Sequence, residues 1–176
     1  SQLEKGISFS RVVIEAKQLG FTEPDPRDDL SGKDVARKAL ILSRLTGQKI
    51  NLKDIKIQSL YPARFQNISI EKFLENIKLL DDFYKKKMSA AQKNKATLKY
   101  VVSITSGKVT VGLKQVSEES DIGSLKGPDN IVVIRTKRYD KNPLVIKGPG
   151  AGAEVTAAGV MADLLKIIRI IKEETI

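Results

Sequence analysis

Apolar residues recur at helical spacing through the first half of the chain and mostly at strand spacing through the second. The helical spacing predicts helices over residues 9–19, 31–46, 69–91 and 155–171. The alternating spacing predicts strands over residues 55–60, 98–105, 108–116, 130–138 and 144–147. Ser106-Gly107 between two of these strands predicts a hairpin. A largely helical part is therefore expected to lead into a run of strands and a closing helix.

The connection between the first two predicted helices is rich in proline and acidic residues. Pro24 and Pro26 restrict the backbone of residues 21–30, which predicts an ordered loop or turn. Ser31 is expected to cap the second helix, with Asp34 three residues later completing a capping box.

This order of elements is typical of an α+β fold. We expect a mixed, mostly antiparallel sheet with helices packed on one face. An open sheet exposes an unpaired edge, and pairing that edge with a second copy of the chain would cover it. A homodimer that uses a sheet edge is therefore expected.

Composition narrows the range of functions. The 176 residues include neither cysteine nor histidine, so thiol chemistry is excluded and proton transfer falls to a carboxylate, a lysine or a tyrosine. The net charge of +10 is spread along the chain, and aromatic residues make up 5% with no tryptophan, so nucleic acid is not an expected partner. No apolar run is long enough for a membrane span. We expect a cytoplasmic protein, or a plastid protein if a transit peptide has been removed.

Ionisable side chains are dense between residues 23 and 38. Asp34 and Lys38 are four residues apart on a predicted helix and share a face, which by itself indicates an exposed ion pair. The proline-stiffened segment before that helix adds Glu23 and Asp29. Several carboxylates near one lysine would also suit a substrate with an ammonium group and a reacting oxygen, to which Lys38 would give a proton.

The sequence TEPDPRDDLSGKDVARK at residues 22–38 resembles the signature of homoserine dehydrogenases, which interconvert aspartate semialdehyde and homoserine with a nicotinamide cofactor. The resemblance implies that Lys38 is the general acid and base of the reaction. It implies that Glu23 and Asp34 bind the amino-acid substrate, and that Asp29 supports the same polar pocket.

A glycine-rich turn, GPGAGA at residues 148–153, lies between the last predicted strand and the last helix. It satisfies a loose dinucleotide fingerprint, but no second strand follows, and a tight connection explains the glycines equally well. GPGAGAEVTAAGV also resembles the closing motif of the same family, which implies that Gly152 contacts the cofactor. The resemblance divides the chain into a substrate-binding and dimerisation domain (1–153) and a helix (154–176) that packs on a nucleotide-binding domain.

Residues 1–22 hold no phosphate-binding glycine loop. In the family, that loop, most NAD(P) contacts and a monovalent cation belong to a preceding domain, so this chain alone is expected to lack dehydrogenase activity. The preference between NAD and NADP is not readable here. The alternative functions are a basic binding module that uses the lysines of residues 85–95 and a structural oligomerisation domain.

Overall fold

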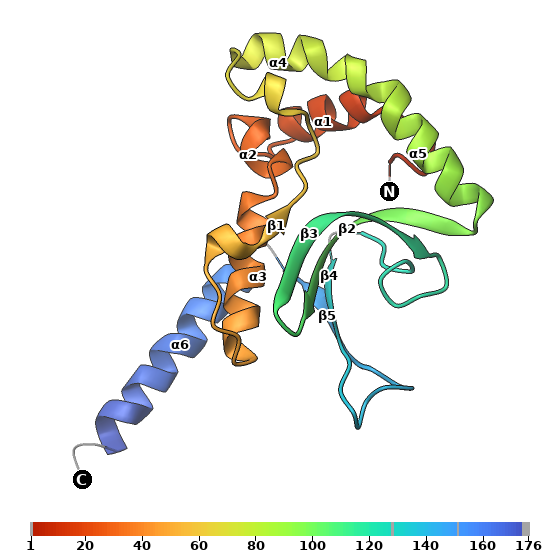
Figure 1. Cartoon of the computed structure of the whole chain (residues 1–176). Coiled ribbons are helices and arrows are strands. Elements are labelled where there is room, and N and C mark those ends of the chain that lie inside the picture. The colour runs from red at the N-terminus through yellow and green to blue at the C-terminus, as the bar shows by residue number, and fades with distance from the viewer. Residues whose placement is uncertain (1, 128, 151, 174–176) are drawn as a thin grey trace. The chain divides into compact units, whose positions relative to one another are not determined.

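A computed structural model describes residues 2–127, 129–150 and 152–173 (Figure 1). Its contacts divide the chain into two compact units, Ser1–Gly123 and Ser124–Ile176. The predicted site residues Glu23, Asp29, Asp34 and Lys38 belong to the first unit, and Gly152 belongs to the second.

The first unit begins with helices. They are α1 (Phe9–Gln18), α2 (Pro26–Leu30), α3 (Lys33–Leu45), α4 (Ile70–Asn76) and α5 (Asp81–Lys93), with short 3-10 turns η1 (Leu52–Asp54), η2 (Ala63–Phe65) and η3 (Ile77–Leu80). The predicted first helix is confirmed as α1. The predicted loop before the second helix is wrong in part, because it folds its last five residues into α2.

The predicted capping box at Ser31 is also wrong. The residue before the first turn of α3 is Gly32, whose φ of 74° is left-handed, and α3 starts at Lys33. Ser31 instead closes α2: its hydroxyl donates to the Asp28 carbonyl at 2.8 Å and accepts from the Lys33 amide at 3.2 Å. The serine therefore joins two helices at a corner.

The predicted long helix over 69–91 is interrupted. Residues 77–80 tighten into η3 between α4 and α5, and Figure 1 shows these helices running over α1. The start of α5 is tied to α1, because the Asp81 carboxylate accepts from both the amide and the hydroxyl of Ser10, each at 2.7 Å. Phe73 and Ile77 are fully buried beside the break, so packing against α1 decides where the helix bends.

A three-stranded mixed sheet completes the first unit. β2 (Ala96–Thr105) and β3 (Lys108–Ser117) form the predicted hairpin, and β1 (Lys56–Ile57) pairs with β3 in parallel, which gives the order β1-β3-β2. Apolar residues on alternate positions pack against α3 and α5, among them Leu98 on β2 and Val111 on β3. The expected α+β fold, with a mixed sheet covered by helices on one face, is confirmed.

The second unit holds β4 (Asp129–Ile134), β5 (Leu144–Pro149) and α6 (Ala153–Glu173). β4 and β5 form a separate antiparallel pair, so the described strands belong to two sheets. β4 ends before the predicted residue 138, because Arg135 donates to the Asp140 carbonyl at 2.8 Å and closes the connecting loop. Along α6, apolar side chains such as Val160 (66%) and Ile168 (40%) are exposed. None of the helices in the described parts of the chain has the length and apolar character needed to cross a membrane.

Candidate functional site

The acidic segment folds back on itself through α2. Pro26 opens this helix, and Asp25 caps it by accepting from the Arg27 amide at 3.0 Å. On the same helix, the Asp29 carboxylate accepts from the backbone amide of Glu23 at 2.9 Å. Two of the predicted substrate-binding residues are therefore brought together, and both are exposed to solvent.

Lys38 and Asp34 form the second pair of predicted site residues. The Lys38 ammonium lies 3.0 Å from a carboxylate oxygen of Asp34, and the two side chains are 65% and 62% exposed. An ion pair this open contributes little to stability, about 0.3 to 0.5 kcal/mol. Both groups are accessible to a ligand, while Ala36 and Ala39 bury the opposite face of α3 completely.

Asp29 on α2 and the Asp34–Lys38 pair on α3 lie on either side of the corner between these helices. In the described parts of the chain, no hydrogen bond or ion pair joins Glu23 or Asp29 to Asp34 or Lys38. The corner has no room for a side chain at Gly32, because a Cβ there would overlap the hydroxyl of Tyr100. That hydroxyl donates to the Gln58 carbonyl at 2.7 Å, and burial raises the pKa of Tyr100, which keeps it a donor.

Arg27 is the residue at this site that the sequence did not single out. Its guanidinium pairs with the Asp25 carboxylate at 2.6 Å and lowers the pKa of that carboxyl by hydrogen bonding. The spacing of a capping aspartate two residues before an arginine could have indicated this pair. The other acceptors of Arg27 are backbone carbonyls, which leave no signal in the sequence.

The glycine turn in the second unit is open at the predicted cofactor contact. Gly152 has a φ of 126°, and its carbonyl accepts from the amide and hydroxyl of Thr156 at 3.0 and 2.9 Å, which starts α6. A Cβ at Gly152 would have no heavy atom within 4 Å, so the backbone can be approached closely by a ligand. Ala151 lies outside the described residues. The open backbone of Gly152 fits the cofactor contact that the family resemblance implies for this residue.

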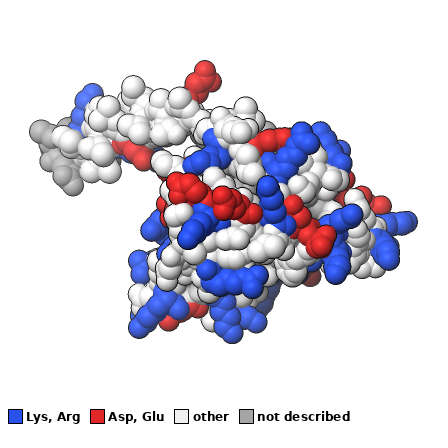
Figure 2. Space-filling model, turned by 90° about the horizontal axis from the view of Figure 1, so that it is seen from above, with Lys and Arg blue, Asp and Glu red and all other residues white. Residues whose placement is uncertain are grey.

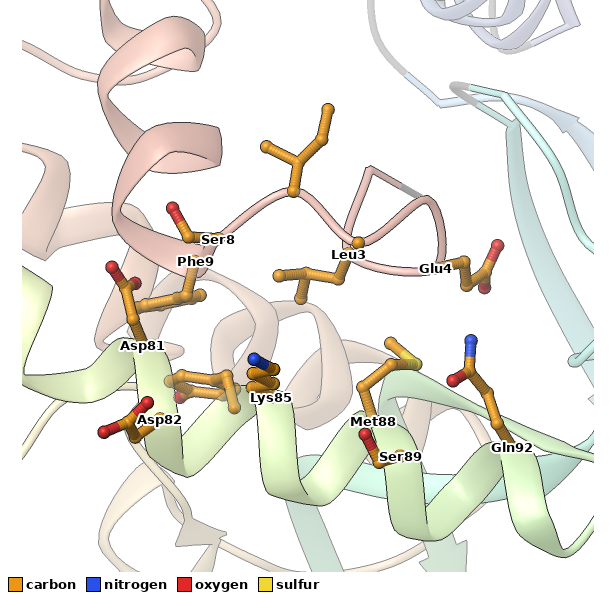
Figure 3. Close-up of a pocket in the computed structure, with 13 residues that line it drawn as sticks. Leu3, Glu4, Ser8, Phe9, Asp81, Asp82, Lys85, Met88, Ser89 and Gln92 are labelled. Carbon is orange, nitrogen blue, oxygen red and sulfur yellow. The ribbon is translucent and has the colours of Figure 1, made fainter.

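A hollow of about 400 Å³ lies elsewhere in the first unit, between the N-terminal turn and α5 (Figure 3). Leu3, Phe9 and Met88 supply apolar walls. Asp81 at its edge is already bonded to Ser10, so it serves the packing of α1 against α5. None of the predicted site residues lines this hollow.

Charged side chains do not gather into one patch on the face seen in Figure 2. Figure 2 shows lysine and arginine scattered over the visible face with acidic side chains between them. Among the residues that the structure describes, no group of three or more acidic side chains is placed to hold a metal ion. The lysine and carboxylates of residues 23–38 therefore stay the candidate site of the first unit.

The chain is similar to known proteins over most of its length. The family model described as homoserine dehydrogenase matches residues 1–165. Over 163 residues the chain is 47% identical to the chloroplastic bifunctional aspartokinase/homoserine dehydrogenase 1 of Arabidopsis thaliana, covering 91% of this chain and 18% of that protein. Over 172 residues it is 43% identical to the homoserine dehydrogenase of Paracoccidioides brasiliensis, covering 94% of this chain and 46% of that protein. The chain thus spans less than half of either relative.

Solved structures share the fold. A Candida auris protein of unknown function superposes with a TM-score of 0.87 at 42% identity, covering 93% of this chain and 46% of that one. A hyperthermophilic archaeal homoserine dehydrogenase in complex with NADPH superposes with a TM-score of 0.64 at 25% identity, covering 94% of this chain and 41% of that one. The chain belongs to the homoserine dehydrogenase family.

Proposed function

We propose that this chain is the substrate-binding and catalytic part of an NAD(P)-dependent enzyme that interconverts L-homoserine and L-aspartate 4-semialdehyde, a step in threonine, methionine and isoleucine biosynthesis. The observation that carries the proposal is the exposed pair of Lys38 and Asp34, 3.0 Å apart beside the acidic segment. The resemblance of residues 22–38 to the family signature implies that these two residues act on the substrate.

Carboxylates would bind the substrate through its ammonium group. Glu23 and Asp34 are exposed, so each can pair with an incoming cation. The Asp29 carboxylate accepts a hydrogen bond of 2.9 Å from the backbone amide of Glu23, and this bond would support the position of the Glu23 side chain. Binding an amino acid would place a second cation near Asp34, and the Lys38 ammonium would then be free to turn toward the reacting oxygen.

Lys38 would move the proton. When the aldehyde is reduced, its oxygen becomes a hydroxyl, and the Lys38 ammonium donates the proton that this requires. In the oxidation of homoserine, the neutral amine of Lys38 accepts the hydroxyl proton. The side chain is 65% exposed, so it can exchange its proton with solvent between turnovers. A bound nicotinamide cofactor would supply the hydride to the substrate carbon that carries this oxygen, or accept it from that carbon.

Most of the cofactor site would come from a further domain. Our support is that the relatives are more than twice as long as the matched region, and that the exposed apolar side chains of α6 need a covering surface. Gly152 would offer its open backbone to the cofactor. The loop that binds the phosphates and the monovalent cation would belong to that domain.

The decisive experiment compares Lys38→Ala with Lys33→Ala in the full-length protein that carries this chain. Lys33 is an exposed lysine on the first turn of the same helix. Lys38→Ala is expected to lower kcat by about 100-fold to 10,000-fold, because general acid-base catalysis is lost, with little change in the KM of the cofactor. Lys33→Ala is expected to keep normal turnover.

If Lys38→Ala turns over homoserine as fast as Lys33→Ala, Lys38 is not the proton donor. The isolated chain, assayed alongside, is expected to show no turnover of homoserine, and activity there would refute the proposal that its cofactor site is incomplete.

Sedimentation velocity on the same samples tests the proposed homodimer. Among the described strands, β2 pairs with β3 alone, so its other edge is the one we propose for pairing with a second copy, and a purely monomeric protein would contradict that pairing.

A further inference from the structure

We infer that Arg27 is a positioning residue for the amino-acid substrate, because it fastens the segment carrying Glu23 and Asp29 to the core of the first unit. The inference rests on the proposed function and assigns a role to a residue that makes no contact with the substrate itself.

One side of the Arg27 guanidinium grips the start of α2. Its Nε donates to Asp25 Oδ1 at 2.9 Å and its Nη2 donates to Asp25 Oδ2 at 2.6 Å. Asp25 at the same time caps α2 through the Arg27 amide at 3.0 Å. A planar guanidinium matches a carboxylate with two parallel hydrogen bonds, which restrains direction as well as distance. The orientation of the first turn of α2 is therefore linked to the guanidinium.

The other side of the guanidinium reaches across to residues 65–68, far away in the sequence. Its Nη1 donates to the carbonyls of Gln66 at 3.0 Å and Ile68 at 2.6 Å, with a longer contact to Phe65 at 3.4 Å. The guanidinium carbon lies 5.6 Å from the ring centre of Phe73. Phe65 and Phe73 are core residues, 4% and 0% exposed, so this end of the bridge is rigid.

Besides Arg27, the bridged segment is held by the fully buried Pro26 and by Leu30, which packs against the core. α2 has five residues, which is too short for a helix to be stable by itself. The Leu30 carbonyl at its far end accepts from the Leu60 amide at 2.9 Å, and the Lys17 side chain reaches the Pro24 carbonyl at the surface. The Arg27 side chain, only 13% exposed, supplies the hydrogen bonds that join this segment to residues 65–68. Losing it should release Glu23 and Asp29 together.

Lys38 is anchored differently. It stands on α3, whose buried face includes Ala36, Ala39 and Ser43, each 0% exposed. The Ser43 hydroxyl also donates to the Ala39 carbonyl at 2.7 Å inside that face. Loosening α2 should therefore displace Glu23, which would bind the ammonium group, together with its support Asp29, and leave Asp34 and the proton donor in place on α3. Such a change raises the KM for the amino acid more than it lowers kcat.

Lysine cannot replace the arginine. The guanidinium presents five donors in a plane, and here they serve a carboxylate on one side and carbonyls on the other. A lysine ammonium keeps the charge but has three donors at one point. Arg27→Lys is therefore the more informative variant, because it retains the attraction to Asp25 and removes the bridge.

The test is steady-state kinetics of Arg27→Lys and Arg27→Ala in the full-length protein. The matched control is Arg44→Ala, because Arg44 also ties a helix to a following loop, through Nε and Nη2 donating to the Ile50 carbonyl at 3.2 Å each. Arg27→Lys is expected to raise the KM for homoserine about tenfold or more, with kcat within about threefold and the cofactor KM unchanged. Arg27→Ala should show a larger rise in the same direction, and Arg44→Ala should leave the KM for homoserine normal.

A normal homoserine KM in Arg27→Lys would overturn the inference. A rise shared equally by Arg44→Ala, or an equal loss of kcat and of both affinities with a lowered melting temperature, would also overturn it, because Arg27 would then be an ordinary fold residue. Lys38→Ala in the same protein separates this from a failure of the proposed function. If Lys38→Ala is impaired while Arg27→Lys is normal, the function stands and the positioning role fails.

Discussion

Two glycine-containing corners of the molecule, at Gly32 and Gly152, are built in different ways. At Gly32, between α2 and α3, the backbone is enclosed by the Tyr100 hydroxyl, and the adjoining acidic segment is fastened to the core by Arg27. At Gly152, before α6, a Cβ would meet no heavy atom of the described residues within 4 Å, and the carbonyl accepts from Thr156. The proposed substrate side is thus preorganised by the chain itself, whereas the proposed cofactor side is left accessible. A substrate site can be completed by one domain, while a cofactor site that joins two domains needs an unfilled surface on each.

Filling the enclosed corner should have the largest effect on stability. Gly32→Ala places a methyl group against the Tyr100 hydroxyl in a left-handed backbone. The left-handed conformation costs about 1 to 2 kcal/mol for alanine, and the overlap adds about 1 to 3 kcal/mol. The free energy of unfolding, measured by urea denaturation, should therefore fall by roughly 2 to 5 kcal/mol.

Gly47→Ala is the matched control for that substitution. Gly47 has a φ of 84°, and a Cβ there would have no heavy atom within 4 Å. It should lose only the conformational part, about 1 to 2 kcal/mol. If both substitutions reduce the free energy of unfolding equally, the contact with Tyr100 is not what requires glycine at position 32.

The open turn contains one crowded position, which sharpens the comparison. A Cβ at Gly150 would overlap the side chain of Asn130 on β4, although Gly150 has no positive φ. Gly150→Ala should destabilise the protein by about 1 to 3 kcal/mol through this overlap alone. Asn130→Ala should largely suppress the loss, which a double-mutant cycle measured by thermal unfolding can detect. Additive effects of the two substitutions would show that the turn depends on Gly150 for another reason.

The smallest expected effect concerns the ion pair at the start of α2. Arg27 lowers the pKa of Asp25 by hydrogen bonding, so the pair stabilises the fold fully above the unfolded pKa of about 3.9 and loses that contribution as the pH falls through the lower folded value. Asp25→Asn should therefore reduce the free energy of unfolding near neutral pH by about 0.5 to 1 kcal/mol, a range kept small by solvent screening.

Urea denaturation at two pH values measures this contribution. The difference between the original protein and Asp25→Asn should shrink as the pH is lowered from about 7 to about 3. Asp28→Asn is the control on the same helix, since Asp28 accepts the Ser31 hydroxyl through its backbone carbonyl, which the substitution keeps. If the difference in the free energy of unfolding does not change with pH, the charge of Asp25 does not contribute, and the residue acts only as a helix cap.

Sequence periodicity predicted the elements of this fold whose formation depends on the local sequence. The β2–β3 hairpin, α1 and α6 follow directly from alternating or helical spacing. Contacts distant in the sequence decided the rest. Ser31 looked like a helix cap, but Gly32, which lies tight against Tyr100, is the residue before the first turn of α3. The helix over 69–91 looked continuous, but Ser10 holds Asp81 at the break.

The candidate site shows the same division. The four-residue spacing of Asp34 and Lys38 was enough to predict their contact, which the structure confirms. The hydrogen bond between Glu23 and Asp29 depends on α2. The sequence did not predict this helix, because Pro24 and Pro26 indicated a loop. The roles assigned to Glu23, Asp29, Asp34, Lys38 and Gly152 stay predictions.

The acceptors chosen by Arg27 have a bearing on how such residues can be found by comparing many sequences. Peptide oxygens at residues 65–68 are supplied by any amino acid, so those positions are free to vary without weakening the bridge. An arginine of this kind has no correlated partner there, and statistical pairing of alignment columns would pass over its link to the core. Its importance can be read from coordinates or from kinetics.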